Sequence, residues 1–268
     1  MKIILLGSNG MLGAYLNKYL GENNEVIALT RKDYDLSKVN VSDLSLLLHK
    51  IVSQDTVIIN AAGIIKQRDY NSIEMIMVNS VLPNVLSEIK NMYTNKNLQV
   101  IHVTTDCVYN GKTGGYDENS PHECIDDYSM SKSLGENQNL TNIRTSIIGE
   151  EITYKKSLLE WVRSNKAGST IYGYVNHLWN GVTCLELAKF IDDIVKEKRY
   201  WKGVRHVISN TVSKHELVSL LNNIYELGLN IEQKSTPEHC YRNLATVYNS
   251  RIKATLEEQI KEMSKYKL

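Results

Sequence analysis

The first fourteen residues constrain the fold of this chain more than any other stretch. An apolar run from Ile3 to Leu6 leads directly into Gly7, Gly10 and Gly13, and the pattern then becomes helical. Gly7 permits a tight turn from a strand into a helix, Gly10 lets a pyrophosphate approach the backbone, and Gly13 lets the helix pack closely on its strand. This stretch therefore predicts a buried strand, a glycine turn and a helix that together hold a dinucleotide.

The glycine spacing is wider than in the usual dinucleotide fingerprint. The sequence has G-x-x-G-x-x-G where the fingerprint has G-x-G-x-x-G, so the spacing alone also fits an ordinary glycine-rich turn. The position of the motif between a strand and a helix favours the dinucleotide, because the free N–H groups at the start of a helix bind phosphates. We expect Asn9, Met11 and Leu12 to contact the cofactor together with the three glycines.

Apolar strand patterns alternate with helical patterns along most of the chain. Alternation of this kind predicts an α/β fold, a doubly wound parallel sheet of the Rossmann type, here with a small C-terminal substrate-binding lobe. We assign residues 1–149 to the dinucleotide-binding domain, with 176–202 returning to it, and residues 150–175 and 203–268 to the lobe. A strand at 204–209 fits either the core or the lobe. A long helix at 73–92 is expected to kink or break at Pro83.

Composition excludes several classes of protein. The 268 residues carry a formal net charge of +1, which gives no reason to expect binding to nucleic acid or to a membrane surface. The four cysteines are widely spaced with no C-x-x-C pair, so neither a metal site nor a disulfide framework is expected. With no signal peptide and no apolar run of about 18 residues, a reducing cytoplasm is the simplest location.

The end of the second strand bears on the choice of cofactor. In dinucleotide-binding folds this strand ends beside the adenosine ribose, where a basic side chain accommodates a 2′-phosphate and an acidic one binds the 2′-hydroxyl. Arg31 and Lys32 favour NADP(H), whereas Asp33 keeps NAD(H) open. We also expect Asp35 and Leu36 to contact the cofactor.

Two further strands end in residues suited to a ligand site. Asn60, Ala61 and Ala62 follow one strand, and their small size lets a backbone or ligand come close, although they could also simply pack under a helix. Thr105 and Asp106 follow the next strand, at the edge where open parallel sheets bind ligands.

Tyr128 and Lys132 open a helix shortly afterwards. Residues at i and i+4 lie on one helical face, so both side chains can reach one ligand. The Y-x-x-x-K pattern is common by chance, but here it follows a Thr-Thr-Asp strand end in a chain that begins with a glycine turn. It therefore indicates a catalytic pair.

Together these motifs resemble the extended short-chain dehydrogenase/reductases, and most closely the dTDP-4-dehydrorhamnose reductases. The resemblance rests on the glycine turn, Asn60-Ala-Ala, Thr105-Asp106, Tyr128-x-x-x-Lys132 and Arg144-Thr145, in the same order as in that family. It covers residues 1–150 well and the remainder only loosely.

The resemblance implies hydride transfer from a nicotinamide to the 4-keto carbon of a nucleotide-linked 4-keto-6-deoxy sugar, on dTDP or UDP. Tyr128 would act as general acid, Lys132 would lower the pKa of Tyr128 and hold the nicotinamide ribose, and Thr105 would bond the carbonyl oxygen. Relatives commonly pair through the helices that carry the Tyr-Lys motif, so a homodimer is possible.

Cys107 departs from the pattern of the family and raises a second activity. Dehydratases carry Asp-Glu where this chain has Asp106-Cys107, so it lacks a dehydratase carboxylate, and the reductases usually have an aromatic residue there. The place of Cys107 resembles that of the cysteine in bifunctional epimerase/reductases. Cys107 could therefore move protons beside the keto group with a second group, Lys155, Lys156 or His177, or it could be a small buried hydrophobe.

The C-terminal half gives weaker signals. Trp179 lies in a segment that, by analogy, contacts substrate, where it could stack on a base or sugar or simply pack at the lobe junction. We therefore include Asp106, Cys107 and Trp179 as candidate substrate contacts. A rival from another class is a non-catalytic NADP-binding subunit resembling the regulatory subunit of methionine adenosyltransferase, against which the intact Thr105, Tyr128 and Lys132 argue.

Overall fold

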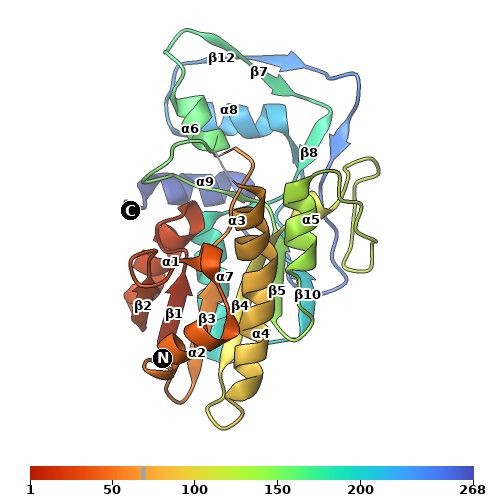
Figure 1. Ribbon diagram of the computed structural model, residues 1–268. Helices are drawn as coiled ribbons and strands as arrows, with labels where there is room; N and C mark the ends of the chain where they lie inside the picture. The colour runs from red at the N-terminus through yellow and green to blue at the C-terminus, as the bar shows by residue number, and fades with distance from the viewer. Residues whose placement is uncertain (68–70) are drawn as a thin grey trace.

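A six-stranded parallel sheet forms the centre of the protein (Figure 1), as seen in a computed structural model that describes residues 1–67 and 71–268. The strand order is β10-β5-β4-β3-β1-β2, and every neighbouring pair is parallel. The order steps outward from β1 in both directions, as in doubly wound folds. The bounds are β1 Lys2–Leu6, β2 Glu25–Leu29, β3 Thr56–Asn60, β4 Gln99–Thr105, β5 Thr141–Thr145 and β10 Gly203–His206.

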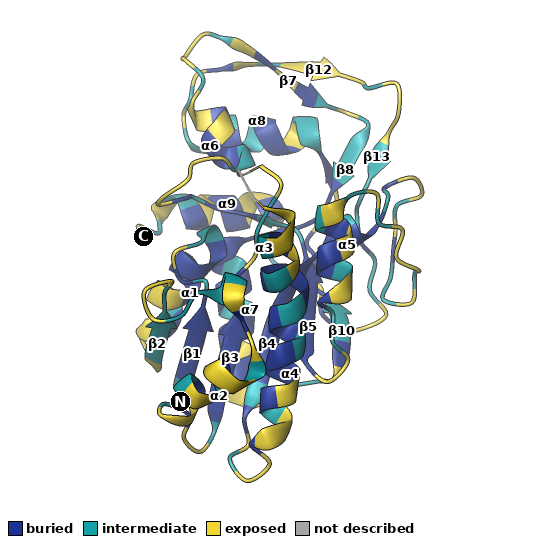
Figure 2. Ribbon diagram, viewed as in Figure 1, coloured by how far each residue is buried: buried dark blue, intermediate teal, exposed yellow. Residues whose placement is uncertain are grey.

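Helices cover both faces of this sheet. Alternate residues of β1 enter two separate cores: Ile3 and Leu5 pack with α1, α7 and α9, whereas Ile4 and Leu6 pack with α2 and α4. Because both faces are covered, the central strands are buried along their length (Figure 2), as apolar runs without alternation predict. The bounds of these helices are α1 Met11–Gly21, α2 Val41–His49, α4 Leu82–Met92, α7 Cys184–Glu197 and α9 Leu256–Lys265. The predicted doubly wound α/β class is confirmed.

The predicted break in the long helix lies before Pro83. Helix α3 (Ser72–Ile76) passes into a π-helical turn, η2 (Met77–Val81), and α4 then begins with Pro83 in its first turn. Proline has no N–H to give to the carbonyl of Asn79, so the regular helix cannot continue through this turn. Helix α5 (Asp127–Leu134) packs here, where a Cβ on Gly135 would lie 2.1 Å from that carbonyl oxygen.

A smaller lobe lies beyond the carboxyl ends of the central strands (Figure 1). Helices α6 and α8 and two small sheets, β11-β8-β13 and β12-β7, make up this part of the chain, whereas the short β6-β9 pair adjoins α7 and α9. Their bounds are α6 Leu158–Arg163, α8 Lys214–Ile224, β6 Ile147–Ile148, β7 Thr170–Tyr174, β8 His177–Trp179, β9 Val182–Thr183, β11 Val212–Ser213, β12 Asn230–Lys234 and β13 Cys240–Tyr241. The 3-10 turns η1 (Leu36–Lys38) and η3 (Asp106–Val108) complete the elements.

One boundary of the predicted division into domains is wrong. The sequence places everything from residue 203 in the lobe, yet β10 pairs with β5 as the edge strand of the central sheet. Val204 is the only strongly apolar residue of this short strand, so its pattern does not distinguish core from lobe. Within residues 1–67 and 71–268, no helix is long and apolar enough to cross a membrane.

Candidate active site

The glycine turn forms one wall of the site. Gly7 has a φ of +81°, and a Cβ there would lie 2.6 Å from the backbone nitrogen of Ala62. A Cβ on Gly13 would lie 2.0 Å from the carbonyl oxygen of Gly7, so the helix and the turn touch through backbone atoms. Gly10 is the N-cap of α1 and provides no side-chain cap, which leaves the N–H groups of the first turn available to an anion.

The residues between the glycines differ in exposure. Asn9 is exposed, Met11 is half-buried, and Leu12 packs into the core behind the turn. Thr153, in the loop that precedes α6, donates a hydrogen bond of 3.5 Å to the carbonyl oxygen of Asn9. The loop that contains Lys155 and Lys156 is therefore anchored beside the glycine turn.

At the end of β2, the acidic and basic side chains are oriented differently. The Asp33 carboxylate turns back and accepts hydrogen bonds from the backbone N–H and the hydroxyl of Thr30, at 2.8 and 2.7 Å. The Arg31 side chain is 72% exposed, with its Nε 3.6 Å from Asp35. Asp35 in turn caps η1, and Leu36 packs against the core beside α2. Arg31, Lys32 and Asp33 are all exposed at this edge, but the Asp33 carboxylate is engaged by Thr30.

The turn after β3 lies against the glycine turn. Asn60 is completely buried, and its Oδ1 accepts a hydrogen bond of 3.2 Å from the N–H of Ala62. The N–H of Ala61 donates to the carbonyl oxygen of Leu6 at 3.1 Å. The backbone of Ala61 and Ala62 is thereby held so close to Gly7 that no Cβ fits at position 7.

Helix α5 presents Tyr128 and Lys132 toward the end of β4. Asp126 begins the helix through a capping box with Ser129. The Lys132 side chain is buried, and its Nζ donates a hydrogen bond of 3.0 Å to the carbonyl oxygen of Val103. Burial lowers the pKa of Lys132 to about 8, against the opposing effect of the Glu136 carboxylate. The ammonium is thus held at the end of β4 by this hydrogen bond.

Thr105, Cys107 and Asp106 surround the Tyr128 hydroxyl. Burial raises the pKa of Tyr128, the nearby Cys107 thiol and Asp106 raise it further, and a hydrogen bond with Thr105 lowers it. The Thr105 hydroxyl donates to Asp106 Oδ1 at 3.2 Å and accepts from the N–H of Cys107 at 3.2 Å. The predicted catalytic residues Thr105, Tyr128 and Lys132 are therefore brought together by β4, η3 and α5.

Two cations from the lobe face this cluster, and the sequence analysis missed both. Arg242 Nη1 lies 3.6 Å from Cys107 Sγ, and Lys214 comes from the first turn of α8. Burial raises the pKa of Asp106, while Arg242 and Lys214 lower it. Burial raises the pKa of Cys107 to about 12, and the neighbouring Asp106 carboxylate contributes to this rise. Single cations from distant segments have no spacing pattern, so no sequence signal could have found them.

A pocket of about 540 Å³ opens in the lobe between α6, β7, β8 and α8. Its walls include Lys214, Lys234, His177 and the aromatic rings of Trp161 and Tyr172. His177, one of the groups considered as a partner for Cys107, stacks on Tyr174 and makes a 2.8 Å hydrogen bond with Thr236.

Trp179 lies at the junction of the lobe and the main domain. Its side chain is only 4% exposed, its Nε1 donates to Ser146 at 2.7 Å, and Lys214 Nζ covers its ring at 5.1 Å from the centroid. This position fits packing at the junction better than stacking on a ligand.

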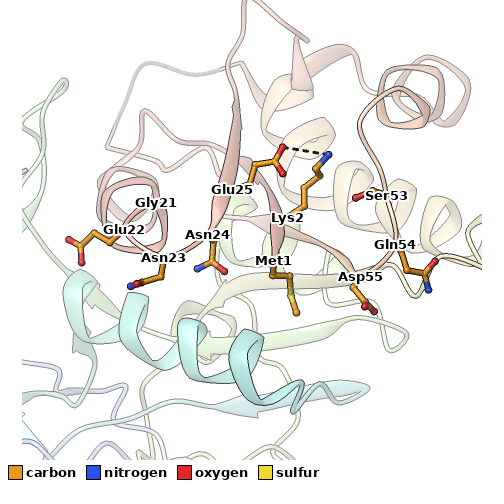
Figure 3. A pocket seen from close by; sticks show the side chains of 10 residues that line it. All are labelled: Met1, Lys2, Gly21, Glu22, Asn23, Asn24, Glu25, Ser53, Gln54 and Asp55. Carbon is orange, nitrogen blue, oxygen red and sulfur yellow. Dashed lines mark ion pairs between the residues drawn. The ribbon is translucent and has the colours of Figure 1, made fainter.

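A second hollow, of about 790 Å³, lies at the opposite end of the sheet (Figure 3). It is formed by the starts of β1 and β2 and by the loops at 21–24 and 53–55, and it contains the Lys2–Glu25 ion pair at 3.5 Å. None of the predicted catalytic residues borders it. Among the described residues, no group of three or more His, Cys, Asp or Glu side chains is arranged to hold a metal ion.

The fold and the Thr-Tyr-Lys site define an extended short-chain dehydrogenase/reductase. More narrowly, the chain belongs to the family described as the RmlD substrate binding domain, which matches residues 1–163.

A curated relative is the spore coat polysaccharide biosynthesis protein SpsK of Bacillus subtilis (strain 168). It is 30% identical over 159 residues, which are 54% of this chain and 52% of that protein. The match therefore spans only about half of the length of this relative.

Solved structures with the same fold include two dTDP-4-dehydrorhamnose reductases, from Clostridium acetobutylicum and from Bacillus anthracis, the latter in complex with NADP. Each has a TM-score of 0.79 at 19% identity, with 98% of both chains covered. The dTDP-glucose 4,6-dehydratase of Bacillus anthracis, in complex with NAD, has a TM-score of 0.72 at 20% identity, with 98% of this chain and 95% of that chain covered. At these identities the similarity establishes the fold.

Proposed function

We propose that this protein reduces the 4-keto group of a nucleotide-linked 4-keto-6-deoxy sugar, on dTDP or UDP, with NADP(H) as cofactor, in deoxysugar biosynthesis. The observation that carries the proposal is the convergence of Thr105, Tyr128 and Lys132 at the carboxyl end of the sheet, beside the turn formed by Gly7 and Gly13. A binding module would need the glycine turn but not the three catalytic side chains.

The residues at the glycine turn fit a dinucleotide. Glycine at positions 7 and 13 lets the turn pack directly against neighbouring backbone, and the first turn of α1 has neither a side-chain cap nor an acidic residue. Backbone N–H groups there can bind the pyrophosphate. When bound, the nicotinamide supplies the hydride that reduces the carbonyl carbon.

The chain's own residues handle the carbonyl oxygen. The Tyr128 hydroxyl gives its proton to this oxygen as negative charge develops there, and the Thr105 hydroxyl rotates from Asp106 to donate a second hydrogen bond. Burial opposes ionisation of Tyr128, so the proton must be released with the help of a cation. Lys132 supplies that cation from the same face of α5, and the Val103 carbonyl fixes its position.

The preference for NADP(H) rests on the edge of β2. The Asp33 carboxylate accepts hydrogen bonds from Thr30, whereas Arg31 and Lys32 extend from the same turn and are exposed. A ribose 2′-phosphate at this edge would meet two cations, and the free carboxylate that selects the 2′-hydroxyl of NAD(H) would be missing. One solved relative, the Bacillus anthracis reductase, is in complex with NADP.

The nucleotide diphosphate is proposed to lie between the catalytic residues and the lobe pocket. Lys214 and Arg242 face Asp106 and Cys107, and Lys214 also lines the pocket together with Lys234. Within residues 1–67 and 71–268, none of these three cations has a carboxylate within ion-pair distance. A bound diphosphate would neutralise them.

The proposed activity is tested by NADPH oxidation with a panel of dTDP- and UDP-linked 4-keto-6-deoxy sugars. We expect turnover with at least one substrate, and loss of turnover in Tyr128→Phe with NADPH binding retained. Binding of NADPH without turnover on any sugar would instead support the regulatory-subunit alternative.

The bifunctional 3,5-epimerase/4-reductase remains a second candidate because Cys107 lies beside Tyr128 and Arg242. Acid-base work by a thiol needs a thiolate, and burial and Asp106 oppose its formation. Solvent deuterium incorporation at C3 or C5 of the sugar tests this activity. Exchange in the parent that is lost in Cys107→Ser would establish it.

A homodimer and a cytoplasmic location complete the proposal. Adjoining helices α3 and α5 expose the apolar residues Ile73, Ile76, Met130 and Leu134, a surface that a second copy could cover. Light scattering of the parent and of Leu134→Asp tests the dimer.

All four cysteines are free, which fits a reducing compartment, and fractionation of cells tests the location.

A further inference from the structure

His102 occupies an unusual place in the central sheet. It lies in the middle of β4 and is completely buried, and its register neighbours are Asn60 on β3 and Asn142 on β5. Its Nδ1 lies 3.1 Å from the Nδ2 of Asn60, while its Nε2 has no hydrogen-bond partner among the described residues. A buried imidazole with one unpaired nitrogen is costly in a sheet core, where an apolar residue would serve packing better.

The hydrogen bonds of Asn60 determine the tautomer of His102. Asn60 Oδ1 accepts from the N–H of Ala62, so the amide group of Asn60 turns its NH₂ toward the imidazole. An NH₂ group can only donate, so Nδ1 of His102 must accept, and the proton of the neutral ring is on Nε2. Burial and the nearby Lys132 ammonium hold the pKa of His102 well below its ordinary value, against the opposing effect of a hydrogen bond with the Asn60 backbone, which agrees with a neutral ring.

The atoms that Asn60 holds belong to the cofactor wall. Ala62, which donates to Asn60, is the residue whose backbone nitrogen a Cβ on Gly7 would strike at 2.6 Å. A Cβ on the next residue, Gly63, would lie 3.5 Å from Asn79 Oδ1 and 3.9 Å from Lys132 Nζ. A shift of this turn would therefore alter both the space beside the glycine turn and the surroundings of the catalytic lysine.

We propose that His102 is a positioning residue for cofactor binding, which acts through Asn60 to fix the 60–62 turn against Gly7. The proposal rests on the proposed function, since it assumes that the glycine turn holds a dinucleotide. The Nδ1 lone pair selects one orientation of the Asn60 amide, and that orientation leaves Oδ1 for the backbone of Ala62. Without this acceptor, the amide can rotate and release the turn.

Two substitutions of His102 separate positioning from packing. Asparagine places its Oδ1 close to the position of Nδ1, so His102→Asn keeps an acceptor for Asn60. Glutamine places its polar atoms near Nε2, so His102→Gln loses that acceptor although its volume is similar. We expect the Kd for NADPH, measured by the change in NADPH fluorescence, to rise at least about fivefold in His102→Gln. This is the lower end of the usual range for coupling between two sites. In His102→Asn the Kd should stay near the parental value.

Two further variants complete the design. Asn60→Leu should raise the Kd as His102→Gln does, and the double variant should add little because both changes break the same chain of contacts. The matched control is Asn142→Leu. Asn142 is buried on the same face of the sheet, and its Nδ2 donates to the carbonyl oxygens of residues 137, 140 and 203, none of which belongs to the cofactor wall. It should leave the Kd unchanged whatever it does to the melting temperature.

Equal Kd values in His102→Gln and His102→Asn would overturn the proposal, as would an equal rise in Asn142→Leu. A measurement on the unmodified protein covers the case in which variants do not fold. Nitrogen-15 spectra of the histidine rings should show His102 neutral with its proton on Nε2, and a proton on Nδ1 would overturn the inference. Because cofactor binding needs no sugar, failure to reduce any sugar would count against the proposed function alone.

Discussion

Arg144 and Glu136 form a buried ion pair that joins the central sheet to the residues just after helix α5. Arg144 Nε lies 2.9 Å from Glu136 Oε1, and Thr104 donates to the same oxygen at 2.9 Å. The guanidinium also donates to the Tyr109 hydroxyl at 2.5 Å and contacts Nε2 of His206 at 2.8 Å. Strand β5, the loop after η3 and β10 are thereby fastened to the residues that follow α5.

Removal of one member of this pair should be strongly destabilising. Arg144→Met leaves the Glu136 carboxylate buried without its partner, and we expect a loss of about 3–5 kcal/mol in the free energy of unfolding, measured in urea. The double variant Arg144→Met/Glu136→Leu should recover much of this loss, because no charge then stays buried. A loss below about 1 kcal/mol in the single variant, within the range of exposed pairs, would show that the pair is not desolvated as described.

Glycine is required at position 13 and should be dispensable at position 21 of the same helix. A Cβ on Gly13 would meet the Gly7 carbonyl oxygen at 2.0 Å, whereas a Cβ on Gly21 meets nothing within 4 Å. We expect Gly13→Ala to abolish NADPH binding and to lower the melting temperature. Gly21→Ala should be stabilising by about 0.5–1 kcal/mol, the usual gain of alanine over glycine in a helix. Similar behaviour of the two variants would contradict the close contact at the turn.

The alkaline side of the activity profile should report Lys132. Its pKa is lowered to about 8, so kcat/KM should fall as the pH rises through about 8 and the ammonium is lost. The effect on stability has the opposite sign. Between the folded pKa of about 8 and the ordinary value of 10.5, the unfolded chain binds more protons, so the free energy of unfolding should rise with pH.

Lys132→Met tests both parts of this prediction. It should be inactive, yet more stable than the parent at pH 7, with the difference shrinking toward pH 10 as the parental lysine loses its charge. Thermal melts across this range and initial rates of NADPH oxidation provide the measurements. An activity profile of the parent that stays flat to pH 10 would contradict the lowered pKa.

Local patterns made the core of this site predictable from the sequence. The fold class was predictable because strand and helix periodicity alternate through the first 149 residues, and the observed sheet confirms it. Tyr128 and Lys132 share one helix, so their common face follows from spacing alone, and Thr105 follows from its place at a strand end. These residues do come together, although their catalytic role stays a prediction.

Long-range features were beyond the reach of sequence patterns. Arg242 and Lys214 approach Cys107 from segments more than a hundred residues away, and nothing local marks them. The edge strand β10 was assigned to the lobe because a short strand with one strongly apolar residue has no periodicity to place it. His102 has no sequence signal of its own, since the role of a buried imidazole depends on its partners in neighbouring strands.

The edge of β2 provides the last prediction, on the choice of cofactor. Arg31→Ala/Lys32→Ala should raise the Kd for NADPH about tenfold, the equivalent of about 1.4 kcal/mol, because a 2′-phosphate would lose two exposed cations. The Kd for NADH should hardly change, since the ribose 2′-hydroxyl carries no charge. Asp33→Asn is the matched control: its carboxylate is tied to Thr30, so this change should leave both constants near their parental values. An equal loss of NADPH and NADH affinity in the double variant would mean that Arg31 and Lys32 support the turn and do not select the phosphate.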